Sequence, residues 1–200
     1  MALEIERRFL VHGDAWRQHV RWQQRLEQGY LLTGGAATAA IGTSLAGTTN
    51  TGAADLTLRV RRSAEQAWLT LKARAPQALA PERPAALSRL EFEYPIPLAD
   101  ADALLALAPQ RLAKWRYGLD LPGGDWVLDV FEGANAPLVV AEVELEQADQ
   151  PLTIPPWCWR EISQRRDLSN AALALHPLQQ WPEADRAALL SPEGTEREPS

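Results

Sequence analysis

The stretch Leu3-Glu4-Ile5-Glu6-Arg7-Arg8-Phe9-Leu10-Val11 decides the fold, because its residues alternate with the period of a β-strand. Successive side chains of a strand point to opposite faces. Apolar Ile5 and Phe9 would therefore face one layer, and the other face would carry the charges of Glu4, Glu6 and Arg8. Taken alone, the stretch also fits a half-buried strand with a solvated outer face.

The same charged alternation recurs along the chain, which favours one shared charged surface over unrelated strands. It is found in the stretches Leu56–Arg61, Trp68–Arg74, Ser88–Tyr94, Lys114–Tyr117, Asp125–Phe131 and Val140–Glu146. The signs are sorted by strand, so a closed or nearly closed sheet would hold basic and acidic walls around one lumen. Carboxylates bind Mg²⁺ or Mn²⁺, and arginine and lysine hold phosphoryl oxygens. The pattern therefore predicts a phosphate-bearing anion bound together with a divalent metal.

The chain resembles the CYTH-domain family, the triphosphate tunnel metalloenzymes, over residues 1–176, and most of all its short bacterial inorganic triphosphatases. The resemblance is carried by an ordered set of motifs, namely Glu4-x-Glu6-x-Arg8, Gln28-Gly29-Tyr30, Leu58–Arg61, Leu69–Lys72, Ser88–Glu93, Lys114–Tyr117, Leu128–Phe131 and Glu142–Glu144. It implies an α+β, mainly β fold. About eight antiparallel strands would close into a β-barrel, the triphosphate tunnel, with a few peripheral helices.

The resemblance also implies a role for each charged residue of the lumen. The predicted substrate ligands are Arg8, Arg59, Arg61, Lys72, Arg89, Arg116 and Arg166. The predicted ligands of Mg²⁺ or Mn²⁺ are Glu4, Glu6, Asp129, Glu142 and Glu144, and the predicted catalytic residues are Lys114, Glu6 and Glu144. Glu91 and Glu93 are expected either to orient these cations or to serve the fold, since buried charges need partners.

Two positions depart from the family pattern. The opening motif usually ends in lysine, and Arg8 replaces its compact ammonium by a wide planar fork that cannot donate a proton in catalysis. Near the C-terminus the family carries Asp, a basic residue, Tyr and Asn. This chain keeps Asn170 but has Leu168 in place of the tyrosine, and we assign the basic contact to Arg166.

The predicted reaction is metal-assisted hydrolysis of the terminal phosphate of a triphosphate, with inorganic tripolyphosphate giving pyrophosphate and phosphate as the first choice. Motifs alone leave other readings open. These are a nucleoside or thiamine triphosphatase, an adenylyl cyclase of class IV, and a polyphosphate-binding module without catalysis.

Composition excludes several other classes of protein. A formal net charge of −6 argues against a nucleic-acid surface. No apolar run of signal-peptide or membrane-spanning length occurs, so we expect a cytoplasmic protein with no membrane partner. The single cysteine, Cys158, excludes an intrachain disulfide, and the three histidines share no zinc-ligand spacing. A homodimer is left open.

Peripheral segments are expected around the tunnel domain. Residues 34–54 form an Ala/Gly/Thr-rich insertion, read as a flexible loop, and residues 177–200 form a C-terminal extension whose end is expected to be disordered. Short helices are predicted over 14–20, 100–108 and 183–190, and residues 168–175 are the candidate for a helix at one end of the tunnel.

Overall fold

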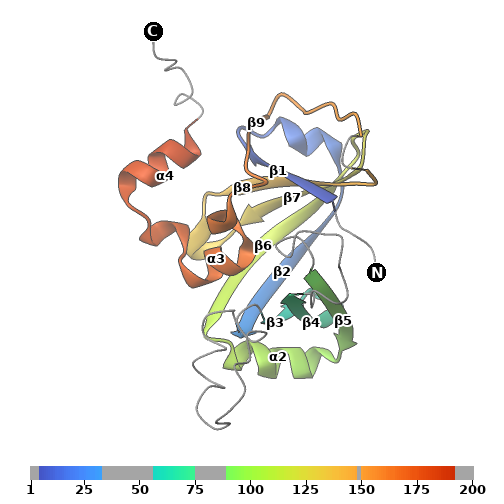
Figure 1. Cartoon of the computed structure of the whole chain (residues 1–200), viewed down its shortest axis with the longest axis vertical. Coiled ribbons are helices and arrows are strands. Elements are labelled where there is room, and N and C mark those ends of the chain that lie inside the picture. Colours follow the sequence, from blue (N-terminus) through green and yellow to red (C-terminus); the bar gives the residue numbers. More distant parts are fainter. Residues whose placement is uncertain (1–4, 33–55, 75–88, 148–149, 192–200) are drawn as a thin grey trace. The chain divides into compact units, whose positions relative to one another are not determined.

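A computed structural model describes residues 5–32, 56–74, 89–147 and 150–191 (Figure 1). Within these ranges, nine antiparallel strands form one sheet in the order β5-β4-β3-β2-β6-β7-β8-β1-β9. Their bounds are β1 Ile5–Val11, β2 Val20–Leu32, β3 Thr57–Arg62, β4 Ala67–Arg74, β5 Arg89–Ile96, β6 Gln110–Leu119, β7 Asp125–Phe131, β8 Val139–Leu145 and β9 Cys158–Glu161. The mainly β, antiparallel class is confirmed, and closure into a barrel stays a prediction.

The chain divides into two compact units. The first unit comprises residues 1–26 and 112–200, and the second comprises residues 27–111. Glu4, the predicted insertion 34–54 and the end of the C-terminal extension, 192–200, lie outside the described residues.

One face of the strands in the first unit forms its hydrophobic core. Along β8, Ala141, Val143 and Leu145 are buried and alternate with Glu142 and Glu144. Because each strand alternates in this way, the core and the charged side chains occupy opposite faces. The buried core residues are Phe9, Trp16, Leu119, Trp126, Leu128, Ala141, Val143, Leu145 and Trp157.

The second unit packs helix α2, Leu98–Leu107, against the apolar face of its strands. Val60 of β3 is buried against Ala101 and Leu105 of the helix. Gly29 of β2 lies beneath the end of α2, where an added Cβ would come within 2.7 Å of the Ala108 Cβ. The close approach explains glycine here and leaves the opposite face of β2 for polar side chains.

The remaining helices agree in part with the sequence expectations. The segment predicted as a helix over 14–20 is a 3-10 helix, η1, Ala15–His19. Helix α3 spans Asn170–Leu175 after the 3-10 turn η5, Arg166–Leu168, and α4 covers Glu183–Leu190 as predicted. The other 3-10 turns are η4, Gly133–Asn135, and η6, Leu178–Gln180. No helix in the described part of the chain is long and apolar enough to cross a membrane.

Strand β9 was not predicted, because its four residues show no charged alternation. It pairs with the end of β1, where Val11 faces Cys158 and Phe9 faces Glu161. The Cys158 thiol is half-buried, and this burial raises its pKa to about 12. Strand β9 therefore ties the start of the C-terminal region to the strand that carries Glu6 and Arg8.

Candidate active site

The charged face of the first unit is assembled by the register of four strands. Arg8 on β1 faces Glu142 on β8, Glu6 faces Glu144, and Arg116 on β6 faces Asp129 on β7. Side chains directly opposite each other in an antiparallel pair lie close enough to interact. The pairing therefore gathers charges that are up to 138 positions apart in sequence, those of Glu6 and Glu144.

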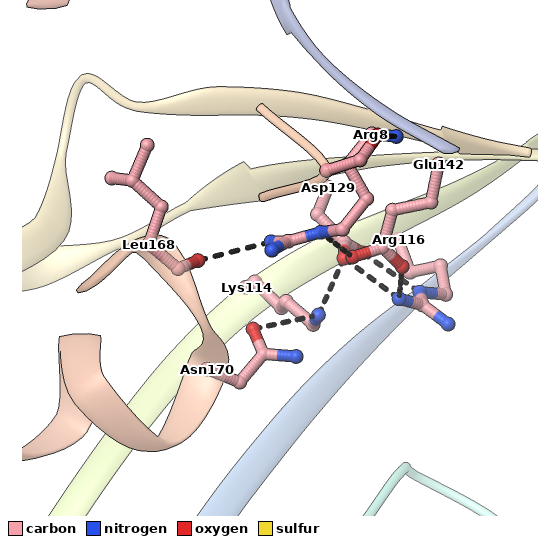
Figure 2. A network of polar contacts seen from close by, with 8 residues as sticks. Arg8, Lys114, Arg116, Asp129, Glu142, Leu168 and Asn170 are labelled. Carbon is pink, nitrogen blue, oxygen red and sulfur yellow. Dashed lines mark hydrogen bonds and ion pairs between the residues drawn. The ribbon is translucent and has the colours of Figure 1, made fainter. Parts of the chain in front are cut away.

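Asp129 is the centre of a buried polar network, the Asp129 network, which also contains Arg8, Lys114, Arg116 and Glu142 (Figure 2). The Lys114 Nζ donates to Asp129 Oδ2 at 2.5 Å. Arg116 donates from Nε to Oδ1 and from Nη2 to Oδ2, both at 2.7 Å. Lys114 and Asp129 are completely buried, so this ammonium and its carboxylate are held away from water.

The pKa shifts show which group in this network can lose a proton. Burial alone would raise the pKa of Asp129, but the charges and hydrogen bonds of Lys114 and Arg116 prevail and lower it to about 2. Burial lowers the pKa of the Lys114 ammonium, and the attraction of Asp129 offsets this only in part. The pKa of Arg116 is raised, because its contacts with Asp129 and Glu142 outweigh its burial. Asp129 and Arg116 therefore stay charged, and Lys114 holds the most labile proton.

Glu142 links this centre to β1. Its Oε2 accepts from Arg116 Nη2 at 2.7 Å, and its Oε1 accepts from Arg8 Nε at 3.1 Å. Arg8 Nη2 also donates to the backbone oxygen of Leu168 at 3.0 Å, and Lys114 Nζ donates to Asn170 Oδ1 at 3.3 Å. The segment between η5 and α3 is thus part of the site.

Three carboxylates form an acidic row at one end of this face, made of Glu6, Glu144 and Asp125. Glu144 on the middle strand faces Glu6 on β1 and Asp125 on β7, and all three residues are exposed. Like charges directly opposite each other destabilise a sheet. A divalent cation would remove this repulsion.

The acidic row suits a metal ion that takes only some of its ligands from the protein. Within residues 5–32, 56–74, 89–147 and 150–191, no three carboxylate, imidazole or thiol groups converge closely enough to form a complete protein cage. Mg²⁺ is commonly held by one or two carboxylates, with substrate phosphates and water as its other ligands. Glu6 and Glu144 supply a pair of this type, whereas both oxygens of Asp129 are already engaged by Lys114 and Arg116.

The charged face of the second unit is a ladder of cations and carboxylates on β3, β4 and β5. Lys72 Nζ lies 2.8 Å from a Glu91 oxygen, and Arg61 Nη2 donates to both oxygens of Glu93 at 3.1 and 3.2 Å. Thr70 is buried between Arg59 and Glu93, accepting from the first at 3.1 Å and donating to the second at 2.9 Å. Glu91 and Glu93 thus orient the cations, one of the two roles expected of them.

Arg59 keeps unused binding capacity in this ladder. Its side chain is 11% exposed, and its Nε is buried with no hydrogen-bond partner in the described part of the chain. A buried donor without a partner is costly, and an anion oxygen would satisfy it. The second unit therefore presents a surface suited to an anion.

The structure distributes the predicted site residues over the two charged faces. Glu6, Arg8, Lys114, Arg116, Asp129, Glu142 and Glu144 share the first face, and Arg59, Arg61 and Lys72 share the second. Arg89 is placed only as a backbone position on β5. Arg166 is exposed in η5, and its side chain makes no hydrogen bond or ion pair with the described residues. Its assignment as a phosphate ligand stays a prediction.

The sequence reading missed some polar groups of these faces. Asp125 lies on the same face as Asp129, four residues earlier, and strand alternation was the signal that could have found it. The same rule applied to Trp68–Arg74 does place Thr70 beside Lys72, but the hydrogen bonds of Thr70 with Arg59 and Glu93 were not predicted. The Leu168 carbonyl is a backbone group, and the side-chain pattern carries no signal for it.

The described residues form a mainly antiparallel protein with a lysine–aspartate–arginine centre, a row of carboxylates and a second cationic face, and this chemistry suits a small polyanion. The family of the chain is established by comparison. The model of the CYTH domain matches residues 2–172, and the chain belongs to this family.

Three of the similar proteins are named inorganic triphosphatases. An inorganic triphosphatase of Acetivibrio thermocellus is 28% identical over 92% of this chain and all of its own length. One from Nitrosomonas europaea is 33% identical over 86% of this chain and 97% of its own. The crystal structure of the inorganic triphosphatase NE1496 superposes with a TM-score of 0.58 at 29% identity, covering 88% of this chain and 96% of that one.

Proposed function

We propose that this chain hydrolyses the terminal phosphate of inorganic tripolyphosphate in a metal-dependent reaction, inside the closed tunnel that the sequence predicts. Water attacks the terminal phosphorus, and the bond from this phosphorus to the bridging oxygen breaks. The products are phosphate and pyrophosphate. The proposal is supported by the names of the similar proteins and by the chemistry of Lys114.

The use of lysine is the observation that carries the proposal. Of the 20 lysine and arginine residues, only Lys72 and Lys114 are lysines, and each lies on one of the two charged faces. Arginine stays charged at any working pH, whereas an ammonium can give up its proton, all the more when it is buried. Lys114 therefore combines the two properties that a phosphoryl-transfer site needs, a positive charge and a mobile proton.

The other residues bind and neutralise the phosphate chain. Arg59, Arg61 and Lys72 would hold phosphoryl oxygens on the second face, where the buried Arg59 Nε needs an acceptor. Arg116 contributes a permanent charge next to Lys114, and Arg89 is a further proposed contact. Lys114 would direct an N–H toward the terminal phosphoryl group or the attacking water.

Mg²⁺ or Mn²⁺ would be held by Glu6 and Glu144, with Glu4, Glu142 and Asp129 as the further proposed ligands. When bound, the ion supplies neutralisation of the phosphoryl oxygens and activation of water. In the structure Glu142 and Asp129 are counterions of Arg8, Lys114 and Arg116, and in this role they keep the cations in place before substrate arrives.

The test is phosphate release from tripolyphosphate, ATP and thiamine triphosphate, each with Mg²⁺, with Mn²⁺ and with a chelator. We expect rapid, chelator-sensitive release from tripolyphosphate and its loss in Lys114→Met, which keeps the length of the side chain. Arg111→Met is the matched control, because Arg111 binds backbone oxygens at the end of α2. Phosphate release from ATP or thiamine triphosphate alone would contradict tripolyphosphate as the substrate and indicate an organic triphosphate instead.

A polyphosphate-binding module without catalysis is the second candidate, because Arg8 replaces the family's lysine. It predicts that tripolyphosphate raises the melting temperature with no phosphate released from any substrate. A cyclase would instead release pyrophosphate from ATP.

A further inference from the structure

The segment from Ser163 to Asn170 is attached to the charged face of the first unit at three points. The backbone N–H of Arg8 donates to Ser163 Oγ at 3.0 Å, and Arg8 Nη2 donates to the Leu168 carbonyl at 3.0 Å. The third contact joins Lys114 Nζ to Asn170 Oδ1 at 3.3 Å. Figure 2 shows the last two contacts approaching the Asp129 network from the same side.

Asn170 limits the freedom of the Lys114 ammonium. An ammonium has three N–H bonds at fixed angles. One of them points to Asp129 Oδ2, and rotation about the Cε–Nζ bond would break this hydrogen bond. The second bond, to Asn170 Oδ1, is a further restraint on the same rotation, so the third N–H keeps its direction.

Arg8 holds Asn170 in place through the main chain. Its guanidinium donates from Nε to Glu142 and from Nη2 to the Leu168 oxygen, two residues before Asn170. Both Arg8 and Leu168 are buried, at 7% and 0% exposed, so water competes little for these bonds. A planar fork can make two contacts in different directions at once, whereas lysine has one nitrogen.

The turn between these contacts is short and defined. Leu168 ends η5, and Ser169 caps α3 by accepting from the backbone N–H of Ala172 at 3.2 Å. A shift of the Leu168 carbonyl would therefore move Asn170 with it.

We propose that Asn170 and Arg8 are positioning residues of Lys114: Asn170 fixes the direction of its third N–H, and Arg8 fixes Asn170 through the Leu168 carbonyl. This rests on the proposed function, in which that N–H meets the terminal phosphoryl group or the attacking water. It assigns to Arg8 a task that differs from direct phosphate binding.

The first experiment measures kcat and KM for tripolyphosphate with Mg²⁺ in Asn170→Ala and Arg8→Lys. We expect each kcat to fall by about 10- to 100-fold with KM changed less than about twofold, because a misdirected group costs rate rather than binding. Asn170→Asp keeps the oxygen that accepts from Lys114, so it should restore kcat with KM unchanged. The double variant should be no slower than the slower single variant.

Arg7→Ala is the matched control for the attachment of the C-terminal segment. Arg7 lies on the opposite face of β1 and pairs with Glu161 at 2.6 Å, with both side chains partly exposed. We expect its kcat to stay unchanged. A raised KM with normal kcat in Arg8→Lys and Asn170→Ala would make these residues phosphate ligands and overturn the proposal, as would kcat values within twofold of the wild type.

A second readout does not need turnover. The chain has two lysines, so protein labelled with ¹⁵N-lysine gives two ammonium signals, and Lys114→Met assigns them. The Lys114 protons should exchange slowly with water in the wild type and faster in Asn170→Ala and Arg8→Lys. Unchanged exchange in both variants overturns the positioning. Slow exchange in the wild type and faster exchange in the variants, in a protein that hydrolyses no triphosphate, would leave the positioning intact and refute the proposed function alone.

Discussion

Replacing Asp129 by asparagine tests whether this carboxylate is above all a counterion. The substitution keeps the shape of the side chain and removes the charge that faces Lys114 and Arg116. The pKa of Asp129 falls from its usual 3.8 to about 2, which corresponds to roughly 2–3 kcal/mol of stabilisation. Loss of one partner from a buried ion pair typically costs about 3–5 kcal/mol. We therefore expect a loss of about 3 kcal/mol.

Thermal unfolding in the presence of a chelator measures this loss without any contribution from metal. For a chain of this size, about 3 kcal/mol corresponds to a fall in Tm of roughly 6–12 °C at pH 7. Because the folded pKa of Asp129 is depressed, its stabilisation is present above the unfolded pKa and is lost as pH falls toward about 2. The Tm values of wild type and variant should therefore converge in acid.

Asp125→Asn is the control, because Asp125 lies on the same strand and the same face but is exposed. Its Tm should stay within about 1 °C of the wild type, as expected for a surface substitution. A fall of less than about 2 °C for Asp129→Asn would refute the counterion role. If that variant also lost the rise in Tm caused by Mg²⁺, Asp129 would be a metal ligand, as the sequence predicted.

Three further predictions follow from the two charged faces. Glu144→Gln should abolish Mg²⁺-dependent phosphate release without lowering the Tm in chelator, because it relieves repulsion from Glu6; retained release would contradict the metal site. Arg59→Ala should weaken binding of tripolyphosphate by tenfold or more, by calorimetry, and a loss of fold in step with binding would point to a structural role. The pKa of Lys114 is lower in the folded protein than in the unfolded chain. At a pH between these two pKa values, the unfolded chain keeps the Lys114 proton and the folded protein has released it. The free energy of unfolding should therefore rise with pH between the lowered pKa and 10.5, and denaturant titration should show no such rise in Lys114→Met.

Strand alternation was enough to predict most of the sheet and the composition of its charged faces. It works because one face of each strand must be buried, so the pairing of Arg8 with Glu142 and of Arg116 with Asp129 follows once the strands are adjacent. It failed for β9, whose place depends on pairing with β1 across more than a hundred residues.

The role of each carboxylate could not be predicted from the sequence. Asp129 and Glu144 look alike as acidic residues on strands, but the fold places Asp129 between two cations, Lys114 and Arg116, and Glu144 between two other acids. That difference is a property of the neighbouring strands. The contact of Arg8 with Leu168 could not be predicted from the sequence either. It uses the backbone carbonyl, which any residue at position 168 would offer.

Cys158 supplies a reporter that is already built into the chain. It is the only cysteine, and a pKa of about 12 leaves almost no reactive thiolate at neutral pH while β9 remains paired with β1. A thiol reagent should therefore modify the protein only when this strand pair opens, and the rate of labelling measures how often it opens. Comparing that rate with and without tripolyphosphate would show whether a ligand on the charged face also closes the edge of the sheet behind it.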